Sequence, residues 1–293
     1  MLVDELDQSP ALWQLFPMAV VRSLLPSGRK ELPERGVRLN RVQVHHRSLT
    51  SYGSVCGFSS TAMLPPTYPH ILAFPLQMAL MTDASCPFPL LGLVHIGNRI
   101  QQYRRIHRDS VLDLECRFGD LMPHDKGTAF SINTFASIAG ERIWSSQSIM
   151  LHRDRNAKNN TKENHKKKAG KAENRPHSQT ESREEWVLDK GTGMRYAQVS
   201  GDFNPIHLHP LSARLFGFPR AIVHGMWTKA RCLAAIAEQL PPAFEVDVQF
   251  KLPILLPAQV TMTQSQQEDH LHFSVHDSKN GSPHLSGRIR PLP

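Results

Sequence analysis

The sequence predicts an α+β fold made of two similar units, each with an antiparallel sheet wrapped around one long helix. Three observations lead to this prediction. A polar, lysine-rich segment divides the chain of 293 residues, a helix pattern followed by several strand patterns stands on each side of it, and a short ungapped match precedes both helices. A helix and a sheet that are each apolar on one face bury these faces against each other.

The helix of the second half is predicted from Met226 to Leu240, because its apolar residues recur at helical spacing before Pro241 and Pro242. Strands follow it. Phe244 to Phe250 alternates apolar and polar residues, and further strands are expected around Val260 and Met262 and from Leu271 to Val275, before the turn Asn280-Gly281.

The first half repeats this order. A helix is predicted from Ile71 to Met81, with Pro75 in its first turn. Four strands are expected after it, at LGLVHIGNRI, Leu112 to Phe118, Ala129 to Phe135 and Ile143 to Leu151. Phe74, Leu76, Leu80 and Met81 are expected in the core, with the wall of a pocket as the alternative.

The lysine-rich segment carries most of the charge. Of the net charge of +8, residues 153–175 contribute nine Lys and Arg against three Asp and Glu, or +6, so about +2 remains elsewhere. No large aliphatic or aromatic residue occurs from 153 to 185, so this segment is predicted to be a linker and a solvated tether. Contact with a nucleic acid, a membrane or an acidic partner is the alternative.

Composition otherwise indicates a soluble globular protein, with 40% apolar and 20% charged residues. No apolar run approaches the roughly 20 residues that span a bilayer, and the acidic N-terminus does not resemble a secretory signal, so we expect a cytoplasmic protein without a membrane span. The four cysteines have no CxxC pair and are expected to be buried thiols.

An ungapped match relates the two halves upstream of their helices. Tyr52 to Phe58 aligns with Tyr196 to Asp202, and at the next comparable position Met63 stands where the second copy has His207. The second copy therefore has ionisable groups where the first has apolar ones. We interpret this as duplication followed by loss of chemistry in the first copy.

Asp202 and His207 are the predicted reacting pair. Pro205 is expected to begin a short helix with Asn204 as its N-cap, which turns His207 back toward Asp202, while Gly201 gives the backbone freedom. A carboxylate and an imidazole around one water can handle both proton transfers when water adds to an enoyl thioester. The amide of Gly225, which opens the long helix, is predicted to stabilise the enolate-like oxygen.

The stretch YAQVSGDFNPIHLHPLSA, from Tyr196 to Ala213, resembles the signature of the MaoC-like, or type 2, enoyl-CoA hydratases. AIVHGM, from Ala221 to Met226, is similar to that family too. The resemblance implies a hot dog fold, and over both halves a tandem (double) hot dog: a degenerate, substrate-shaping unit at 1–152, a basic linker at 153–185 and a catalytic unit at 186–293.

The resemblance also implies a function. It assigns catalysis to Asp202 and His207 and the oxyanion contact to Gly225, and it implies reversible hydration of trans-2-enoyl thioesters to (R)-3-hydroxyacyl thioesters without an added cofactor. The expected partner is an acyl-CoA or acyl-carrier-protein thioester and not a nucleic acid. Phosphates or an acidic partner would be met by basic residues at the tunnel mouth, for which Arg99, Arg220 and Lys251 are candidates.

Three neighbouring residues are assigned to substrate binding with structural alternatives. Asn204 can cap the local helix or hold the catalytic water, His224 can support the loop before the long helix, and Tyr196 can brace the motif. His207, His209 and His224 could be imagined as a zinc site, but no Cys or Glu completes a usual ligand spacing, so no metal is expected.

Two other hot dog functions remain open at this point: a thioester-binding protein without hydration activity and a thioesterase. A monomer and a homodimer are equally consistent with the sequence.

Overall fold

The computed structural model describes residues 2–23, 31–90, 92–153, 179–267 and 269–293. The elements of the first half are β1 (Leu2–Leu6), α1 (Leu12–Ser23), β2 (Arg35–Gln43), α2 (His46–Cys56), α3 (Tyr68–Thr82), β3 (Leu93–Gln102), β4 (Val111–His124), β5 (Gly127–Ile138) and β6 (Glu141–Arg153). Those of the second half are β7 (Gln179–Leu188), α4 (Thr192–Ser200), the 3-10 helix Pro205–His207, α5 (Pro210–Leu215), α6 (Gly225–Ala235), the 3-10 helix Ala237–Gln239, β8 (Phe244–Phe250), β9 (Ala258–Gln267), β10 (His270–Asp277) and β11 (Pro283–Pro291).

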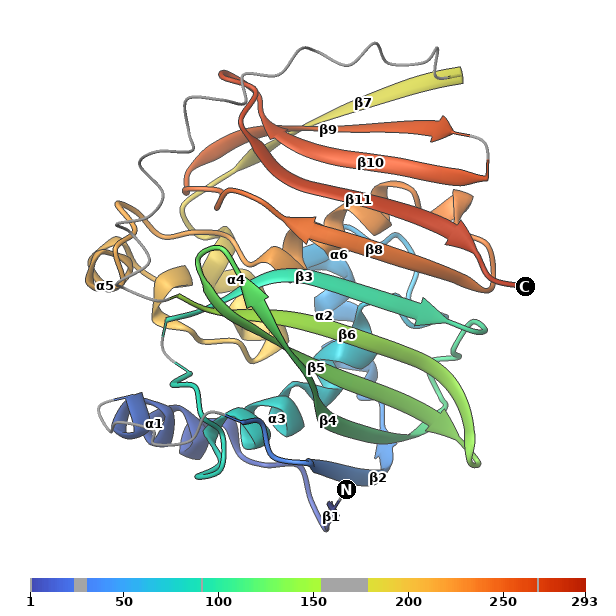
Figure 1. Ribbon diagram of the computed structural model, residues 1–293. Helices are drawn as coiled ribbons and strands as arrows, with labels where there is room; N and C mark the ends of the chain where they lie inside the picture. The colour runs from blue at the N-terminus through green and yellow to red at the C-terminus, as the bar shows by residue number, and fades with distance from the viewer. Residues whose placement is uncertain (1, 24–30, 91, 154–178, 268) are drawn as a thin grey trace.

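The described strands form one sheet in the order β1-β2-β4-β5-β6-β3-β8-β11-β10-β9-β7. β3 and β8 pair antiparallel in its middle and join the two halves (Figure 1). The expected antiparallel arrangement is confirmed for the strands that wrap the two helices, whereas β1 adds to β2 in parallel at one edge. The core is continuous across the joint, because buried side chains of both halves belong to one cluster.

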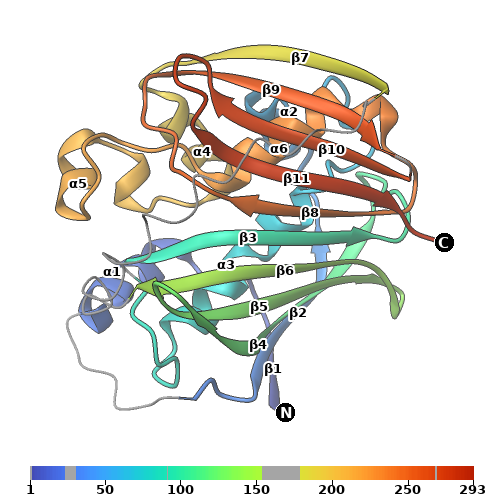
Figure 2. The ribbon, with the colours of Figure 1, turned by 45° about the horizontal axis from the view of Figure 1, so that its top comes forward.

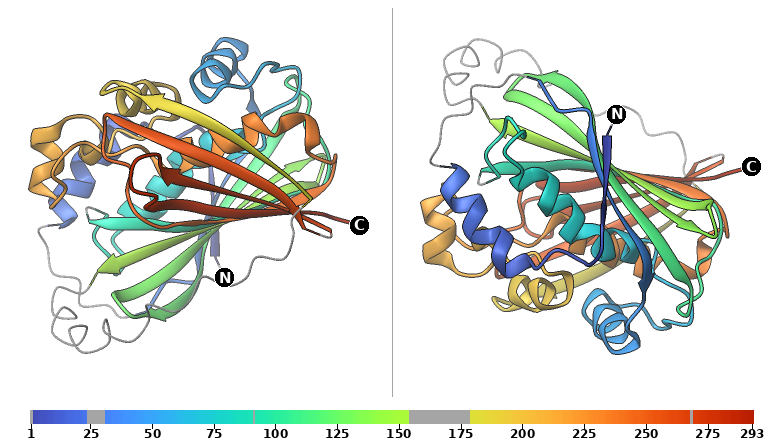
Figure 3. Two further views of the ribbon diagram at one scale, coloured as in Figure 1. Left: turned by 90° about the horizontal axis from the view of Figure 1, so that it is seen from above. Right: turned by 90° about the horizontal axis from the view of Figure 1, so that it is seen from below.

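The two halves have the same strand order read from opposite ends of the sheet. β2-β4-β5-β6-β3 in the first half corresponds to β7-β9-β10-β11-β8 in the second, with α3 and α6 in equivalent places. Both helices lie on the same side of the sheet (Figures 2 and 3). This repetition is the tandem hot dog arrangement that the sequence predicts.

The ungapped match also corresponds in space. α2 ends at Gly57 and α4 ends at Gly201, both in the left-handed region, with φ of 84° and 76°. The aligned tyrosines Tyr52 and Tyr196 are both buried, and their ring centroids lie 6.2 Å apart where the two helices meet. The alignment of the two segments therefore reflects equivalent structure.

The two long helices differ from the predictions in their ends. α3 begins at Tyr68 with Pro69 in its first turn, so the prediction that Pro75 lies in the first turn is wrong; Pro75 lies inside the helix. Tertiary burial explains this outcome, because α3 is enclosed by the sheet and packing outweighs the lost hydrogen bond. α6 ends at Ala235, and a 3-10 turn covers part of the remaining predicted length.

The expected linker is shorter than predicted at its C-terminal end. Residues 179–185, the last part of the predicted linker, belong to β7, which pairs with β9. β7 is an edge strand, and the exposed charged residues Arg183, Glu184 and Glu185 suit such an edge because they oppose further strand pairing. At the other end, Arg153 is the last residue of β6, and the rest of the predicted linker, 154–178, lies outside the described residues.

The remaining expectations concern cysteines and membrane spans. All four cysteines are free and buried, as predicted. No helix in the described ranges is long and apolar enough to cross a bilayer.

Candidate active site

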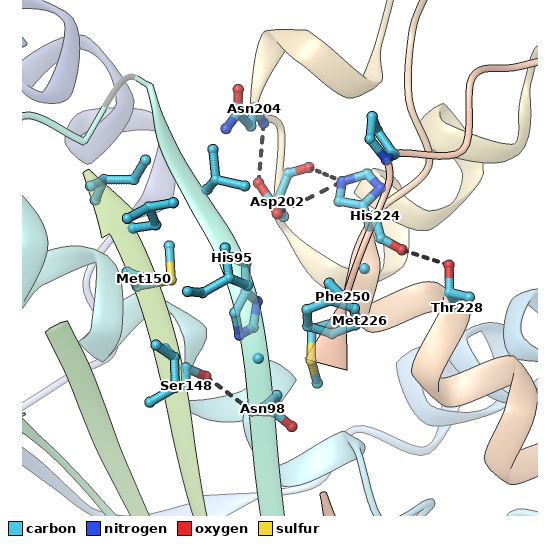
Figure 4. A pocket seen from close by; sticks show the side chains of 18 of the residues that line it. His95, Asn98, Ser148, Met150, Asp202, Asn204, His224, Met226, Thr228 and Phe250 are labelled. Atoms are coloured by element: carbon cyan, nitrogen blue, oxygen red, sulfur yellow. Dashed lines mark hydrogen bonds and ion pairs between the residues drawn. The ribbon is translucent and has the colours of Figure 1, made fainter. Parts of the chain in front are cut away.

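A cavity of about 810 Å³ lies between the two halves and is lined by residues of both. All six predicted site residues line it: Tyr196, Asp202, Asn204, His207, His224 and Gly225. Figure 4 shows Asp202, Asn204 and His224 on one side of the cavity and side chains of β3 and β6 on the other. The fold thus brings together residues that the sequence spreads over 30 positions with those of the first half.

Asp202 is placed by the end of α4. The left-handed Gly201 ends the helix, and the carboxylate oxygen Oδ1 of Asp202 then accepts a hydrogen bond from the amide of Asn204 at 3.2 Å. The Asp202 side chain keeps 31% of its surface exposed, on the side that lines the cavity. A substrate or water in the cavity can therefore reach this carboxylate.

His207 is placed by the predicted short helix. Pro205 begins the 3-10 helix, and the side chain of Asn204 accepts from the amide of Ile206 at 3.4 Å, which confirms Asn204 as the N-cap. His207 Nδ1 lies 2.8 Å from the carbonyl oxygen of Ile222. Because a carbonyl only accepts, Nδ1 carries the proton and Nε2 of the neutral ring has the free lone pair that a base needs.

The three ionisable groups of the site converge. One carboxylate oxygen of Asp202 and one ring nitrogen each of His207 and His224 lie within 4.8 Å of one another. The two imidazole rings are stacked with centroids 3.6 Å apart, and His224 Nε2 donates to the main-chain oxygen of Asp202 at 3.0 Å. His224 therefore supports the loop, as expected, by tying Asp202 to the segment before α6.

Burial moves the pKa values of the pair toward each other. Desolvation raises the pKa of Asp202, and the nearby His207 and the amide of Asn204 oppose that rise. Desolvation also lowers the pKa of His207, against the opposing effects of Asp202 and the Ile222 carbonyl. Burial therefore destabilises the charged form of both groups. Such a pair is suited to exchanging one proton with a bound water.

Gly225 is the first residue of α6, so its N–H has no acceptor within the helix. The ring of Phe250 packs against it: a Cβ at this position would lie 3.0 Å from two ring atoms. Glycine therefore allows both the Phe250 contact and the approach of a substrate oxygen to the amide. This is the geometry expected of an oxyanion contact at a helix start.

Tyr196 lines the same cavity from α4. It is buried, and its ring centroid lies 4.8 Å from that of His224. Its hydroxyl oxygen is buried without a hydrogen-bond partner among the residues described by the structure. Tyr196 thus braces the histidine, as the structural alternative for this residue predicts.

His209 does not belong to the converging group. It lies outside the cavity and caps α5, where its Nδ1 accepts from the amide of Leu211 at 3.2 Å. The sequence suggested His207, His209 and His224 as a conceivable group of three. In the structure, the residue that lies beside His207 and His224 is Asp202, not His209. Each ring uses one nitrogen in a hydrogen bond to a main-chain carbonyl, His207 to Ile222 and His224 to Asp202.

The other predicted residues divide between cavity and core. Phe74 and Met81 line the cavity, whereas Leu76 and Leu80 are fully buried core. Of the candidate basic residues, Arg99 and Lys251 line the cavity and Arg220 does not.

Sequence reasoning missed a polar group of cavity residues in the first half: His70, Gln77, His95, Asn98 and Ser148. The polar positions inside the otherwise apolar strand LGLVHIGNRI were the available signal for two of them.

We expect stability to fall as the pH is lowered from about 6.5 to 4.5. Burial lowers the pKa of His70 to about 3 and that of His95 to about 4, and it also lowers the pKa values of His207 and His224. The unfolded chain binds protons on these residues near pH 6.5 and the folded chain binds fewer. For His70 and His95 the cost is about 1.4 kcal/mol per pH unit each, and His207 and His224 act in the same direction. The raised pKa of Asp202 makes the folded protein more stable as the pH falls, but this is one group against the four histidines.

Urea unfolding at half-unit pH steps measures this dependence. The variant His95→Gln removes one titrating ring that faces the cavity and is expected to reduce the slope by about one proton. A free energy of unfolding that stays constant between pH 6.5 and 4.5 would contradict the prediction.

Comparison with known proteins relates the chain to dehydratases. A family model described as MaoC like domain matches residues 171–286. The 3-hydroxyacyl-thioester dehydratase X of Mycobacterium tuberculosis is 31% identical over 262 residues, which cover 89% of this chain and 91% of the relative. The crystal structure of HtdX from that organism matches with a TM-score of 0.74 at 30% identity, covering 88% of this chain and 100% of the other.

Two further similarities are narrower in what they show. An (R)-specific enoyl-CoA hydratase of Aeromonas caviae is 37% identical over 70 residues, 22% of this chain and 52% of that enzyme. A Mycobacterium tuberculosis protein described as having a double hotdog fold matches with a TM-score of 0.55 at 12% identity, over 90% of this chain and 94% of the other, and so supports the fold alone. From the long match to the dehydratase and the geometry of the site, the chain belongs to the family of MaoC-like dehydratases.

Proposed function

We propose that the protein is a hydro-lyase of fatty-acid metabolism that interconverts trans-2-enoyl and (R)-3-hydroxyacyl thioesters. One observation carries this proposal: a carboxylate and an imidazole lie within 4.8 Å of each other in a cavity that also contains the free amide of a helix start. Relatives named 3-hydroxyacyl-thioester dehydratase and (R)-specific enoyl-CoA hydratase support it.

In the hydration direction, the Asp202–His207 pair takes a proton from water while the water oxygen bonds to C3 of the enoyl group. The C2=C3 π electrons move toward the thioester carbonyl, and the amide of Gly225 donates to the oxygen that becomes negative. The proton then passes from the pair to C2, which completes the addition. Because the two groups are coupled, both proton transfers are assigned to the pair.

The residues around the pair are proposed to hold the substrate. Asn204 fixes the loop and can orient the water, His224 holds Asp202 in place, and the buried ring of Tyr196 packs against His224. The second half is proposed as the catalytic unit and the first half as the unit that shapes the acyl site, because only the second carries the acid and the base.

The thioester is proposed to be attached to coenzyme A or an acyl carrier protein. Lys251 and Arg99 line the cavity and are the candidate cations for phosphates or an acidic carrier. Arg99 also donates to the carboxylate of Asp247 at 3.0 Å, whereas Lys251 donates to the neutral side chain of Gln249, so the charge of Lys251 is the less compensated of the two and Lys251 is the stronger candidate. A cytoplasmic location, the absence of a cofactor and metal, and the choice between monomer and homodimer stay predictions.

The decisive experiment follows the loss of enoyl conjugation with trans-2-enoyl-CoA substrates of several lengths. We expect turnover to the (R)-3-hydroxyacyl product, with no free thiol released. Release of thiol would indicate a thioesterase, and binding without turnover would indicate a thioester-binding protein.

A further inference from the structure

The side of the cavity formed by the first half is polar. His70 and Gln77 of α3, His95 and Asn98 of β3 and Ser148 of β6 all line it. We call His95, Asn98 and Ser148, which are labelled together in Figure 4, the polar wall. A plain hydrocarbon chain against this wall would cover polar groups without pairing them, which costs free energy.

A β-bulge creates the wall. The register of β3 against β6 shifts between His95 and Gly97. In a regular strand, His95 and Asn98 would point to opposite faces because they are three residues apart. The extra residue in the bulge turns His95 to the face of Asn98, so both side chains reach the cavity.

Asn98 is held in one orientation by a buried lysine. Lys229, one turn after Gly225 in α6, is fully buried, and its Nζ donates to Asn98 Oδ1 at 2.6 Å and to the Asn98 carbonyl at 2.9 Å. The Asn98 amide nitrogen must then face β6, where it donates to Ser146 Oγ at 2.9 Å and Ser148 Oγ at 3.0 Å. Since Ser148 accepts this bond, its own hydroxyl hydrogen is left to donate.

His95 supplies the second free group. Its Nε2 is buried without a hydrogen-bond partner in the part of the chain that the structure describes. Burial holds the pKa of His95 to about 4, so the ring is neutral near pH 7. A neutral ring and a serine hydroxyl suit an uncharged oxygen, which can accept from Ser148 and exchange a hydrogen bond with Nε2.

The wall lies beyond the reacting carbons. The Phe250 ring packs on Gly225, and the centroid of the His95 ring lies 5.0 Å from that of Phe250. One aromatic ring therefore separates the oxyanion amide from the wall, and a chain whose thioester oxygen binds Gly225 can reach His95 with its later carbons.

We propose that the polar wall binds a hydroxyl or oxo group carried by the acyl chain beyond the two reacting carbons, so that the preferred substrate is an oxygen-substituted enoyl thioester. The inference rests on the proposed hydration activity and adds the substrate class to it.

The test compares trans-2-octenoyl-CoA with the same substrate carrying one hydroxyl at each carbon from C5 to C8. At one of these positions, the hydroxylated substrate is expected to have a kcat/KM on the order of fivefold to tenfold above that of the plain substrate, the value of one or two buried hydrogen bonds. A ratio of one or less at every position overturns the inference.

Two variants assign the preference to the wall. His95→Phe keeps an aromatic ring without nitrogen, and Ser148→Ala removes only the hydroxyl; each is expected to bring the ratio close to one. Met150→Leu, on the same strand and in the same cavity, is the matched apolar control and should keep the wild-type ratio. If His95→Phe does not fold, Ser148→Ala alone decides.

The outcomes separate this inference from the proposed function. A protein that hydrates the plain substrate but shows no preference, or whose preference survives both wall variants, contradicts the polar-wall inference alone. A protein that hydrates none of the substrates contradicts the proposed function and this inference with it.

Discussion

Asp202→Asn and His207→Asn are each expected to lower kcat for enoyl-CoA hydration by about 10²- to 10⁴-fold, the usual contribution of a positioned acid or base. An amide cannot take a proton from water, and asparagine has nearly the shape of the aspartate that it replaces at position 202. The double variant should lose little more than either single variant, because the two groups act as one unit. Stopped-flow absorbance of the enoyl thioester measures these rates.

The thermal stability of each variant shows whether a loss of activity comes from lost catalysis or from lost folding. Because burial raises the pKa of Asp202, its negative charge costs more free energy in the folded protein than in the unfolded chain, so Asp202→Asn should not lower Tm and is expected to raise it. His209→Asn is the matched histidine control, since His209 lies outside the cavity. Wild-type turnover in either Asp202→Asn or His207→Asn would remove that residue from the mechanism.

Gly193→Ala is expected to displace a catalytic residue, although Gly193 itself does not line the cavity. A Cβ at Gly193 in α4 would lie 2.2 Å from the main-chain oxygen of His207, far closer than real Cβ contacts, so α4 or the 3-10 helix must move. We expect a loss of about 1–3 kcal/mol in the free energy of unfolding. A shift of His207 by about 1 Å also lowers kcat by about 10²-fold.

Gly191→Ala is the matched control two residues away. A Cβ there would come closest to the guanidinium of Arg195, which is the far end of a flexible side chain and can move at little cost. Denaturant unfolding and kcat of both variants compare the two positions. If Gly193→Ala retains wild-type kcat and stability, His207 is not held by the close approach of α4.

The local geometry of the reacting pair could be predicted because it depends on neighbouring residues. Pro205 and Asn204 form the start of the 3-10 helix as expected, and the left-handed Gly201 ends α4 just before Asp202. The order of helix and strands in each half could also be predicted. Alternation of apolar and polar residues, as from Phe244 to Phe250, indicates a strand with one buried face.

Errors arose where distant contacts outweigh local preference. Pro75 lies inside α3 because the sheet encloses that helix, and the start of β7 lies within the predicted linker because pairing with β9 orders a charged segment that has no apolar signal. The polar wall was not predicted either. Its formation needs the bulge in β3 and the contact of Lys229 with Asn98, 131 positions away in the chain.

The sequence by itself determined which residues can react and how the loop around them turns, since a stretch of six residues with one proline decides that geometry. Only the tertiary structure decided what surrounds the pair. The pairing of β3 with β8 brings the first half against the second, so burial shifts the pKa values of Asp202 and His207 and polar groups of the first half enter the cavity. These effects depend on what lies nearby in space, and neighbours in space are set by packing of the whole chain.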